Sequence, residues 1–271
     1  MGVCKDPTVK KLNSLGYNMV KLPRVGIEPL DVLGREDKSM EKLGSITDVW
    51  TSTVAAPVPG APVSVSSING EKTESLDLAI GLKTLGDALA GLGAGISLPS
   101  LTLGFKNARK IQFRFVNVES TSVTPFALGR FLSVGSLDMA NPFVSHYFGN
   151  DETQEYIIVD VLKSNSVSVT AQDSNGVDVA ADVGALSGAL SANVKVNTSS
   201  ASSNEITFQS TGAKATFAFK IFEVVFENGK WMPQGVKADD SLSFGVSVGG
   251  ESTETGEDGI VLSPGTSIRL R

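Results

Sequence analysis

The amino-acid sequence predicts an α+β fold with a large, twisted, mostly antiparallel central sheet and peripheral helices. Two observations lead to this prediction. Several short runs alternate apolar and polar residues, as strands with one buried face do. Two stretches rich in glycine or alanine instead repeat leucine or valine every three or four residues, which is the spacing of an amphipathic helix.

The N-terminal part of the chain contains short elements separated by turns. Residues 8–15 are expected to form a helix that ends at Gly16, because glycine suits the left-handed conformation that follows a helix. Residues 19–33 are apolar but are interrupted by Pro23 and by further proline and glycine. We expect extended chain with turns there, with proline at a sheet edge or a strand start. Residues 52–70 are rich in Ser, Pro and Ala, which predicts a loop.

Residues 76–98 carry a helical stripe that glycine weakens. The stripe consists of Leu78, Leu82, Leu85, Leu89 and Leu92. Glycines are interspersed among these leucines, and each glycine in a helix interior costs about 0.5–1 kcal/mol relative to alanine. The segment is therefore expected to be helical only if tertiary packing holds it so.

The middle of the chain alternates strand patterns with a second ambiguous stretch. Residues 111–118, 156–162 and 167–172 are expected strands. Residues 177–196 then combine small residues with helical spacing before ending in a strand pattern. The apolar positions of that stretch are Val179, Val183, Leu186 and Leu190.

The C-terminal third is rich in strand patterns. In residues 217–226 the apolar residues change parity, which predicts a bulge or a bend. Residues 242–248 form another alternating run. Residues 249–259 contain no aliphatic side chain and are expected to be solvated, and residues 260–271 form a short apolar and basic ending.

Composition excludes several classes of function. The chain has 271 residues, 41% of them hydrophobic, and a formal net charge of −6, so we expect a sizeable core and no nucleic-acid partner. It has one cysteine, Cys4, and one histidine, His146, which excludes an internal disulfide and a cysteine- or histidine-rich metal cluster. His146 lies in an expected turn, so we expect a structural or surface histidine and no catalytic residues. A metal cluster made only of carboxylates is left open, although the sequence has no Asp/Asn ladder with calcium-loop spacing. We expect a protein that is not an enzyme and that needs no metal, and a hydrolase that uses carboxylates is the weaker alternative.

No segment resembles a secretory signal or a membrane-spanning helix. The N-terminus lacks the apolar stretch of a signal peptide, and no run of about 18 apolar residues occurs in the chain. The expectation is a soluble, cytoplasmic protein.

The opening residues 4–36 carry a series of short motifs. They are Cys4, Asp6-Pro7, Gly16-Tyr17-Asn18, Leu22-Pro23-Arg24, Gly26-Ile27 and Pro29-Leu30. This series resembles the N-terminal block of the bacterial gasdermins. The resemblance implies a gasdermin N-domain-like fold in a closed, cytoplasmic, autoinhibited monomer.

The resemblance also implies a mode of action. A pore-forming body at 1–248 would be followed by a cleavable linker at 249–259 and an autoinhibitory tail at 260–271. A partner protease, caspase-like or trypsin-like, would remove the tail during anti-phage defence. The freed body would then bind membrane lipids and oligomerise in the bacterial inner membrane into large β-barrel pores that cause cell death.

Particular residues acquire roles from this resemblance. The family carries a palmitoyl group on an N-terminal cysteine, which corresponds to Cys4, and needs no other cofactor. The expected cleavage region contains Gly249, Gly250, Glu251, Gly256 and Gly259, and the apolar residues available for docking the tail are Ile260, Val261, Leu262, Ile268 and Leu270. The expected membrane-inserting segments are about 76–116 and 157–196, including the leucine and valine positions named above.

Each of these interpretations has an alternative. The two inserting segments can be permanent amphipathic helices on a sheet, Cys4 can be a small buried apolar residue, and the tail can be the last strand of the fold. The competing hypothesis for the whole chain is a non-enzymatic β-rich structural or binding protein.

Overall fold

The structure is a computed structural model that describes residues 12–235 apart from 13, 37–38, 67–74, 151–152, 192, 200–201 and 228. Most of the helix expected at 8–15 and all of the strand expected at 242–248 lie outside the described residues. Gly16 has a left-handed φ of 83°, as expected for the residue that ends a helix.

All strand pairings in the described residues are antiparallel. The strands are β1 (Asn18–Arg24), β2 (Asp31–Glu36), β3 (Ser39–Ser45), β4 (Trp50–Ser52), β5 (Val63–Ser64), β6 (Leu76–Asp77), β7 (Lys110–Val116), β8 (Glu119–Ser122), β9 (Gly135–Leu137), β10 (Thr153–Ser164), β11 (Ser166–Gln172), β12 (Asp178–Val179), β13 (Val194–Ser199), β14 (Ser202–Ser210), β15 (Ala215–Glu227) and β16 (Lys230–Gly235). The helices are α2 (Ile46–Val49), α3 (Leu78–Gly91), α4 (Leu98–Gly104), α5 (Pro125–Val134), α6 (Pro142–Phe148) and α7 (Val183–Ala189).

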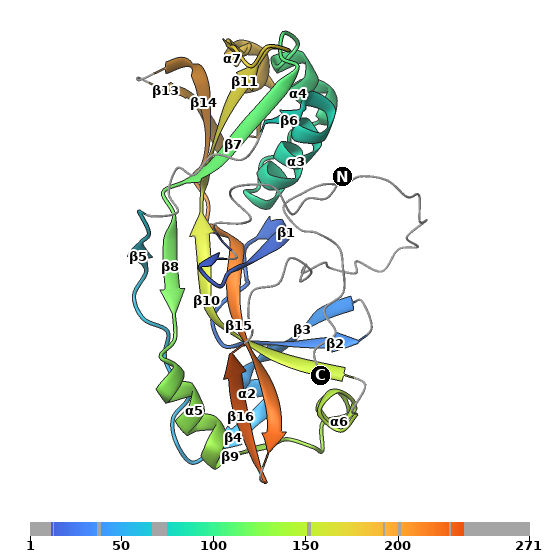
Figure 1. The fold of residues 1–271 in the computed structure, drawn as a ribbon, viewed down its shortest axis with the longest axis vertical. Coiled ribbons are helices and arrows are strands. Elements are labelled where there is room, and N and C mark those ends of the chain that lie inside the picture. The colour runs from blue at the N-terminus through green and yellow to red at the C-terminus, as the bar shows by residue number, and fades with distance from the viewer. Residues whose placement is uncertain are drawn as a thin grey trace.

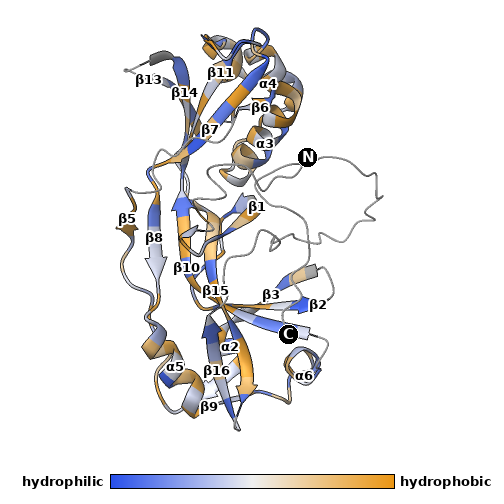
Figure 2. Cartoon of the chain, in the orientation of Figure 1, coloured by the Kyte–Doolittle hydropathy of each residue, from blue (hydrophilic) through white to orange (hydrophobic). Residues whose placement is uncertain are grey.

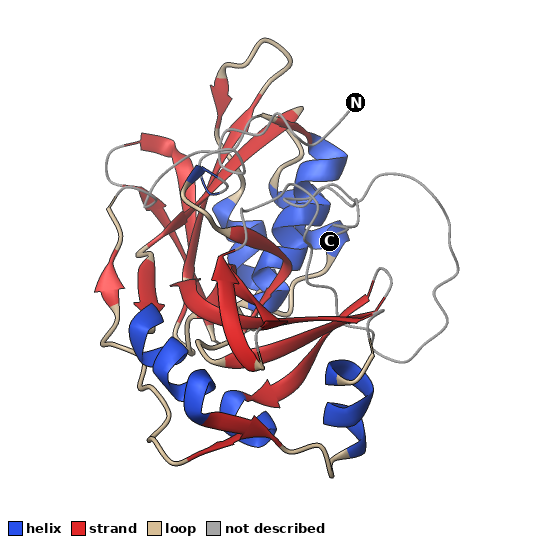
Figure 3. Cartoon of the chain, turned by 60° about the horizontal axis from the view of Figure 1, so that its bottom comes forward, coloured by secondary structure: helices blue, strands red, loops and turns tan. Residues whose placement is uncertain are grey.

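The strands form two main sheets. The eight-stranded sheet has the central order β1-β15-β10-β2-β3, with β16, β8 and β5 attached. The six-stranded sheet has the order β13-β14-β11-β7-β6, with β12 attached to β11, and β4 pairs with β9 separately. Figure 1 shows the two main sheets one above the other, and Figure 3 shows the helices gathered beside the six-stranded sheet and at the opposite end of the molecule.

Three long stretches of chain pass from one sheet into the other, so the predicted central sheet is present but is interrupted. β7 continues into β8, β10 into β11, and β14 into β15, and the breaks lie at Asn117, at Asn165 and at residues 211–214. Asn117 has a φ of 56°, a conformation that asparagine tolerates better than most residues. The Ser164 hydroxyl donates to the Val116 carbonyl at 2.5 Å, which joins two of the breaks. Side-chain hydrogen bonds at the breaks also include one from the Asn165 amide to the Ser210 carbonyl at 3.2 Å, a long-range contact that residue periodicity does not report.

The bulge predicted at residues 217–226 is present at Phe217, because Leu162 pairs with Ala218 and the next residue, Lys163, pairs with Thr216. The change of parity further along β15 reflects burial of both faces of the strand. Ile221 packs in one core cluster and Val224 in another, on opposite faces of β15. Ile158 pairs with Ile221 and Asp160 with Lys220, so Val159 is the extra residue of a second bulge, which belongs to β10. A bulge in the partner strand changes the local pairing without interrupting β15.

Other expectations for local structure had mixed outcomes. Pro23 lies in β1, which is at the end of the central strand order, and this confirms an edge position.

The turn predicted around His146 is wrong, because residues 142–148 form α6. Its N-terminus is capped by the Asn141 side chain, which accepts from the Phe143 N–H at 3.0 Å, and proline occupies the first helical position.

Candidate functional site

The six-stranded sheet has one apolar and one polar face. Along β7 the buried residues Ile111, Phe113 and Phe115 alternate with less buried polar or apolar residues. Directly opposite residues in paired strands share a face, and Phe113 is opposite Val169, which is opposite Ile206. The alternation of colour along β7 is visible in Figure 2. The three central strands therefore present matching apolar rows.

The opposite face of the same strands is lined with polar side chains. Arg114 is opposite Ser168, which is opposite Thr207, and the Ser168 and Thr207 hydroxyls are 2.6 Å apart. The Arg114 guanidinium reaches across β11 to Glu205, with its Nη2 at 2.6 Å and its Nε at 3.1 Å from the same carboxylate oxygen. These polar groups satisfy one another, as buried polar groups such as Ser168 need to be.

Three helices cover the apolar face. Leu85 and Leu89 of α3, Leu101 of α4 and Leu186 of α7 are fully buried in one cluster with Phe113 and the other apolar residues of the sheet. Figure 1 shows α3 and α4 beside β7, with α7 near them at the same end of the molecule. The largest apolar cluster of the described residues thus lies between an amphipathic sheet and three glycine-containing helices, two of which have only seven residues.

The glycines explain how these helices fit. A Cβ at Gly81 would overlap the Ile111 side chain, a Cβ at Gly104 would overlap Leu186, and a Cβ at Gly91 would overlap the Pro23 carbonyl oxygen. The close approach of helix to neighbour requires glycine there. The expectation that only packing keeps residues 76–98 helical is consistent with these contacts.

The leucine stripe occupies α3 largely as predicted. Leu82, Leu85, Leu89 and Leu92 are buried, and Leu78 is partly buried against the same cluster. The helix ends earlier than the stretch expected from the sequence, at Gly91, because Gly93 adopts a left-handed φ of 79° and a separate helix, α4, begins at Leu98.

The second helical pattern was predicted too long. Only Val183 and Leu186 lie within α7, whereas Val179 lies in β12 and Leu190 caps the helix end. Asp182 starts the helix by accepting from the Ala185 N–H at 3.0 Å, which is the N-cap arrangement that aspartate favours. All four side chains still pack against the core of the six-stranded sheet.

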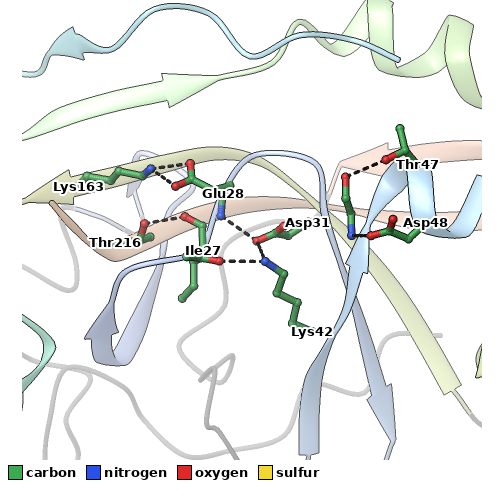
Figure 4. Close-up of polar contacts among 10 residues, drawn as sticks. Ile27, Glu28, Asp31, Lys42, Thr47, Asp48, Lys163 and Thr216 are labelled. Atoms are coloured by element: carbon green, nitrogen blue, oxygen red, sulfur yellow. Dashed lines mark hydrogen bonds and ion pairs between the residues drawn. The ribbon is translucent and has the colours of Figure 1, made fainter. Parts of the chain in front are cut away.

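The N-terminal motifs tie the first two strands to the centre of the eight-stranded sheet. The Thr216 hydroxyl donates to the Ile27 carbonyl at 2.9 Å, and Lys163 binds the Glu28 carboxylate at 2.5 Å. Lys42 binds Asp31 at 2.8 Å and donates to the Gly26 carbonyl at 2.9 Å. Figure 4 shows these contacts converging on the turn between β1 and β2.

Several predicted site residues cannot be placed. Cys4, the expected cleavage region at 249–259 and the expected tail at 260–271 all lie outside the described residues. His146 is exposed at the end of α6, consistent with a surface histidine.

Among the described residues, no group of three or more His, Cys, Asp or Glu side chains is arranged to hold a metal ion. None of the described helices is long and apolar enough to cross a membrane.

The polar face of the six-stranded sheet was not singled out from the sequence. The sequence does contain a pattern that indicates this face, because apolar and polar residues alternate in both 111–115 and 166–172. The polar residues of the two runs are the ones that lie opposite each other in the structure. The sequence pattern alone does not tell that these two runs pair with each other, so the shared polar face was not predicted.

Comparisons with known proteins match most of the residues that form these sheets and helices. Residues 20–231 match the family model described as Bacterial Gasdermin Family. A gasdermin from Vitiosangium sp. is 37% identical over 232 residues, which are 85% of this chain and 85% of that protein. A gasdermin from a Desulfuromonadales bacterium is 28% identical over 270 residues, 98% of each chain.

A solved structure supports the similarity of fold. The bacterial gasdermin from Bradyrhizobium tropiciagri matches with a TM-score of 0.65 at 16% identity, and the match covers 86% of this chain and 92% of that one. The matched family region includes the N-terminal strands, the amphipathic sheet and its covering helices.

Proposed function

Because this chain belongs to the bacterial gasdermin family and has a gasdermin-like α+β fold, we propose that it is an autoinhibited pore-forming protein. Proteolytic removal of a short C-terminal peptide lets the body oligomerise in the bacterial inner membrane. The resulting large pores kill the cell in anti-phage defence, and the activating protease is caspase-like or trypsin-like.

The observation that carries the proposal is the two-faced sheet. Strands that cross a membrane as a closed barrel alternate lipid-facing apolar residues with lumen-facing polar residues. β7, β11 and β14 have this alternation in matched register, so Phe113 and Val169 would face lipid while Arg114 and Ser168 faced water. The helices would have to leave for that face to reach lipid.

Strand length adds a second argument. A spanning strand needs about 9–11 residues, and β7 and β11 have seven residues each. The missing length is available in the neighbouring segments, where α3 has 14 residues and α4 and α7 have seven each, and all three helices contain glycine and pack on the sheet. Refolding about 76–116 and 157–196 into longer hairpins would both uncover the apolar face and lengthen its strands.

The test of the proposal is controlled removal of the tail. A recognition site for an added protease, placed within residues 249–259, should make the full-length protein release dye from phospholipid vesicles only after cleavage. The uncut protein, and the unmodified chain treated with the same protease, serve as controls. Cut protein that leaves the dye inside the vesicles would contradict the proposal and favour a structural or binding role.

The proposal also assigns a palmitoyl group to Cys4. One acyl chain gives only marginal, reversible membrane binding, so the lipid would assist insertion rather than anchor the intact protein. Cys4→Ala should weaken killing in cells that produce the cut protein, without changing the thermal unfolding temperature. Undiminished killing together with an intact mass lacking an acyl adduct would remove the lipid from the mechanism.

A further inference from the structure

We propose that β1 acts as a latch that holds the C-terminal end of α3 on the body, so that β1 restrains the first step of unrolling this helix. This inference rests on the proposed function for its consequence, because unrolling matters only if residues 76–116 insert. The contact itself is a property of the intact chain.

An arch in β1 forms the latch. Met19 pairs with Ala218 and Arg24 with Thr216, so five residue steps along β1 correspond to two along β15. Residues 20–23 therefore leave the ladder between these two pairings. Proline at position 23 suits this arch, because it has no N–H to contribute to a ladder.

The arch meets α3 where only glycine fits. Gly91, the last residue of the helix, approaches the Pro23 carbonyl oxygen so closely that a Cβ would overlap it, and the Pro23 Cβ would be 3.2 Å away. Gly86, one turn and a half earlier in the same helix, would bring its Cβ no closer than 3.6 Å to Leu101, which is an ordinary contact. The two glycines thus differ in the contact they permit, not in the helix that contains them.

The latch is itself fixed to the central strands. The Tyr17 hydroxyl donates to Asp160 at 2.7 Å, and the Lys220 ammonium lies 4.3 Å from the centre of the Tyr17 ring. Tyr17 and Met19 belong to the same buried cluster as Leu89 and Leu92. Figure 1 shows β1 lying between the lower end of α3 and the central strands.

The two ends of α3 are held by different partners. At its start, the Leu78 N–H donates to the Arg109 carbonyl at 2.9 Å and the adjoining β6 pairs with β7, which belongs to the same inserting segment. At its end, the helix contacts β1, which lies outside that segment. The start of α3 can therefore stay in contact with β7 during insertion. The end of α3 must separate from β1 before the helix can become an extended strand.

The experiment compares Gly91→Ala with Gly86→Ala in the full chain carrying the added protease site. Hydrogen exchange measured by mass spectrometry should show the amides of residues 82–92 exchanging about tenfold faster in Gly91→Ala than in Gly86→Ala. Amides of β10 and β15 should be equally protected in both. After cleavage, Gly91→Ala should release vesicle dye faster than Gly86→Ala. Pro23→Gly, which loosens the arch without adding an atom, should shift both measurements in the same direction.

Equal exchange of residues 82–92 in the Gly91, Gly86 and Pro23 variants would overturn the latch. Faster exchange with unchanged dye release, in conditions where the cut parent chain does release dye, would overturn its regulatory role. If the cut parent chain releases no dye, the proposed function fails, and the exchange comparison alone decides whether β1 restrains α3.

Discussion

At the scale of single residues, Glu155 is the buried ionisable group with the clearest consequence. It lies on β10, its side chain is buried, and its Oε1 atom has no hydrogen-bond partner among the described residues. Burial raises the pKa of this carboxyl to about 7, and the nearby Glu223 carboxylate adds to the effect. The folded protein therefore favours the protonated form, whereas the unfolded chain ionises at the ordinary value near 4.5.

This difference predicts a pH dependence of stability. Below the pKa of the unfolded chain both states hold the proton, and between about 4.5 and about 7 only the folded state does, so the free energy of unfolding should fall as the pH rises through this range. The full loss is of the order of 3 kcal/mol. Urea unfolding at pH 5 and pH 8 should show Glu155→Gln with a smaller change than the parent, while Glu41→Gln, on the exposed part of β3, should behave as the parent does. If the free energy of unfolding changed equally between pH 5 and pH 8 in all three proteins, Glu155 would not be the source of the pH dependence.

Residue identity predicted some positions well and others not at all. The spacing of Leu82, Leu85 and Leu89 correctly indicated a buried helix face, because that face is set by local geometry. The reason for glycine at 91 could not be read from the sequence. It depends on a carbonyl oxygen 68 positions earlier in the chain, brought there by the arch in β1.

At the scale of elements, the contact between α4 and α7 is the next feature to test. Gly104 of α4 is buried against Leu186 of α7, and an added Cβ would overlap that leucine. Gly188 of α7 has open space where its Cβ would be. The two helices thus offer one glycine that packing requires and one that it does not.

Alanine at these two positions should have opposite effects. Gly104→Ala should lower the free energy of unfolding by about 1–3 kcal/mol through overpacking, and Gly188→Ala should leave it unchanged or raise it by up to about 1 kcal/mol through helix propensity. The midpoint of urea unfolding, compared between each variant and the parent chain, measures the change in the free energy of unfolding. A Gly104→Ala protein as stable as Gly188→Ala would mean that α4 and α7 are not in close contact.

Elements with strong local signals were predicted best. The strands at 111–118, 156–162 and 167–172 correspond to β7, β10 and β11, because alternation or a continuous apolar run reports burial directly. α4, α5 and α6 were missed. They start with Ser97, Thr124 or Asn141 followed closely by proline, a local capping signal that is easily taken for a turn.

At the scale of the whole molecule, the prediction of α+β architecture with a twisted antiparallel sheet and a gasdermin-like fold is confirmed. The division of that sheet into two parts was not predicted. Polar contacts of Asn117, Ser164 and Asn165 lie at the breaks and join strands distant in sequence, so local periodicity does not report them. The roles of Cys4, of the linker at 249–259 and of the tail at 260–271 stay predictions.

The central claim is that the apolar face of the six-stranded sheet becomes the lipid-facing surface of a pore. Since Cys4 is the only cysteine, a Cys4→Ser background that retains dye release allows one fluorescent label at a time, introduced through Gln112→Cys, Phe113→Cys, Arg114→Cys or Phe115→Cys. In cut protein bound to vesicles, nitroxide-bearing lipids should quench the labels at 113 and 115, and aqueous iodide should quench those at 112 and 114. Quenching without this two-residue period, or no lipid quenching at any of the four positions, would contradict the account.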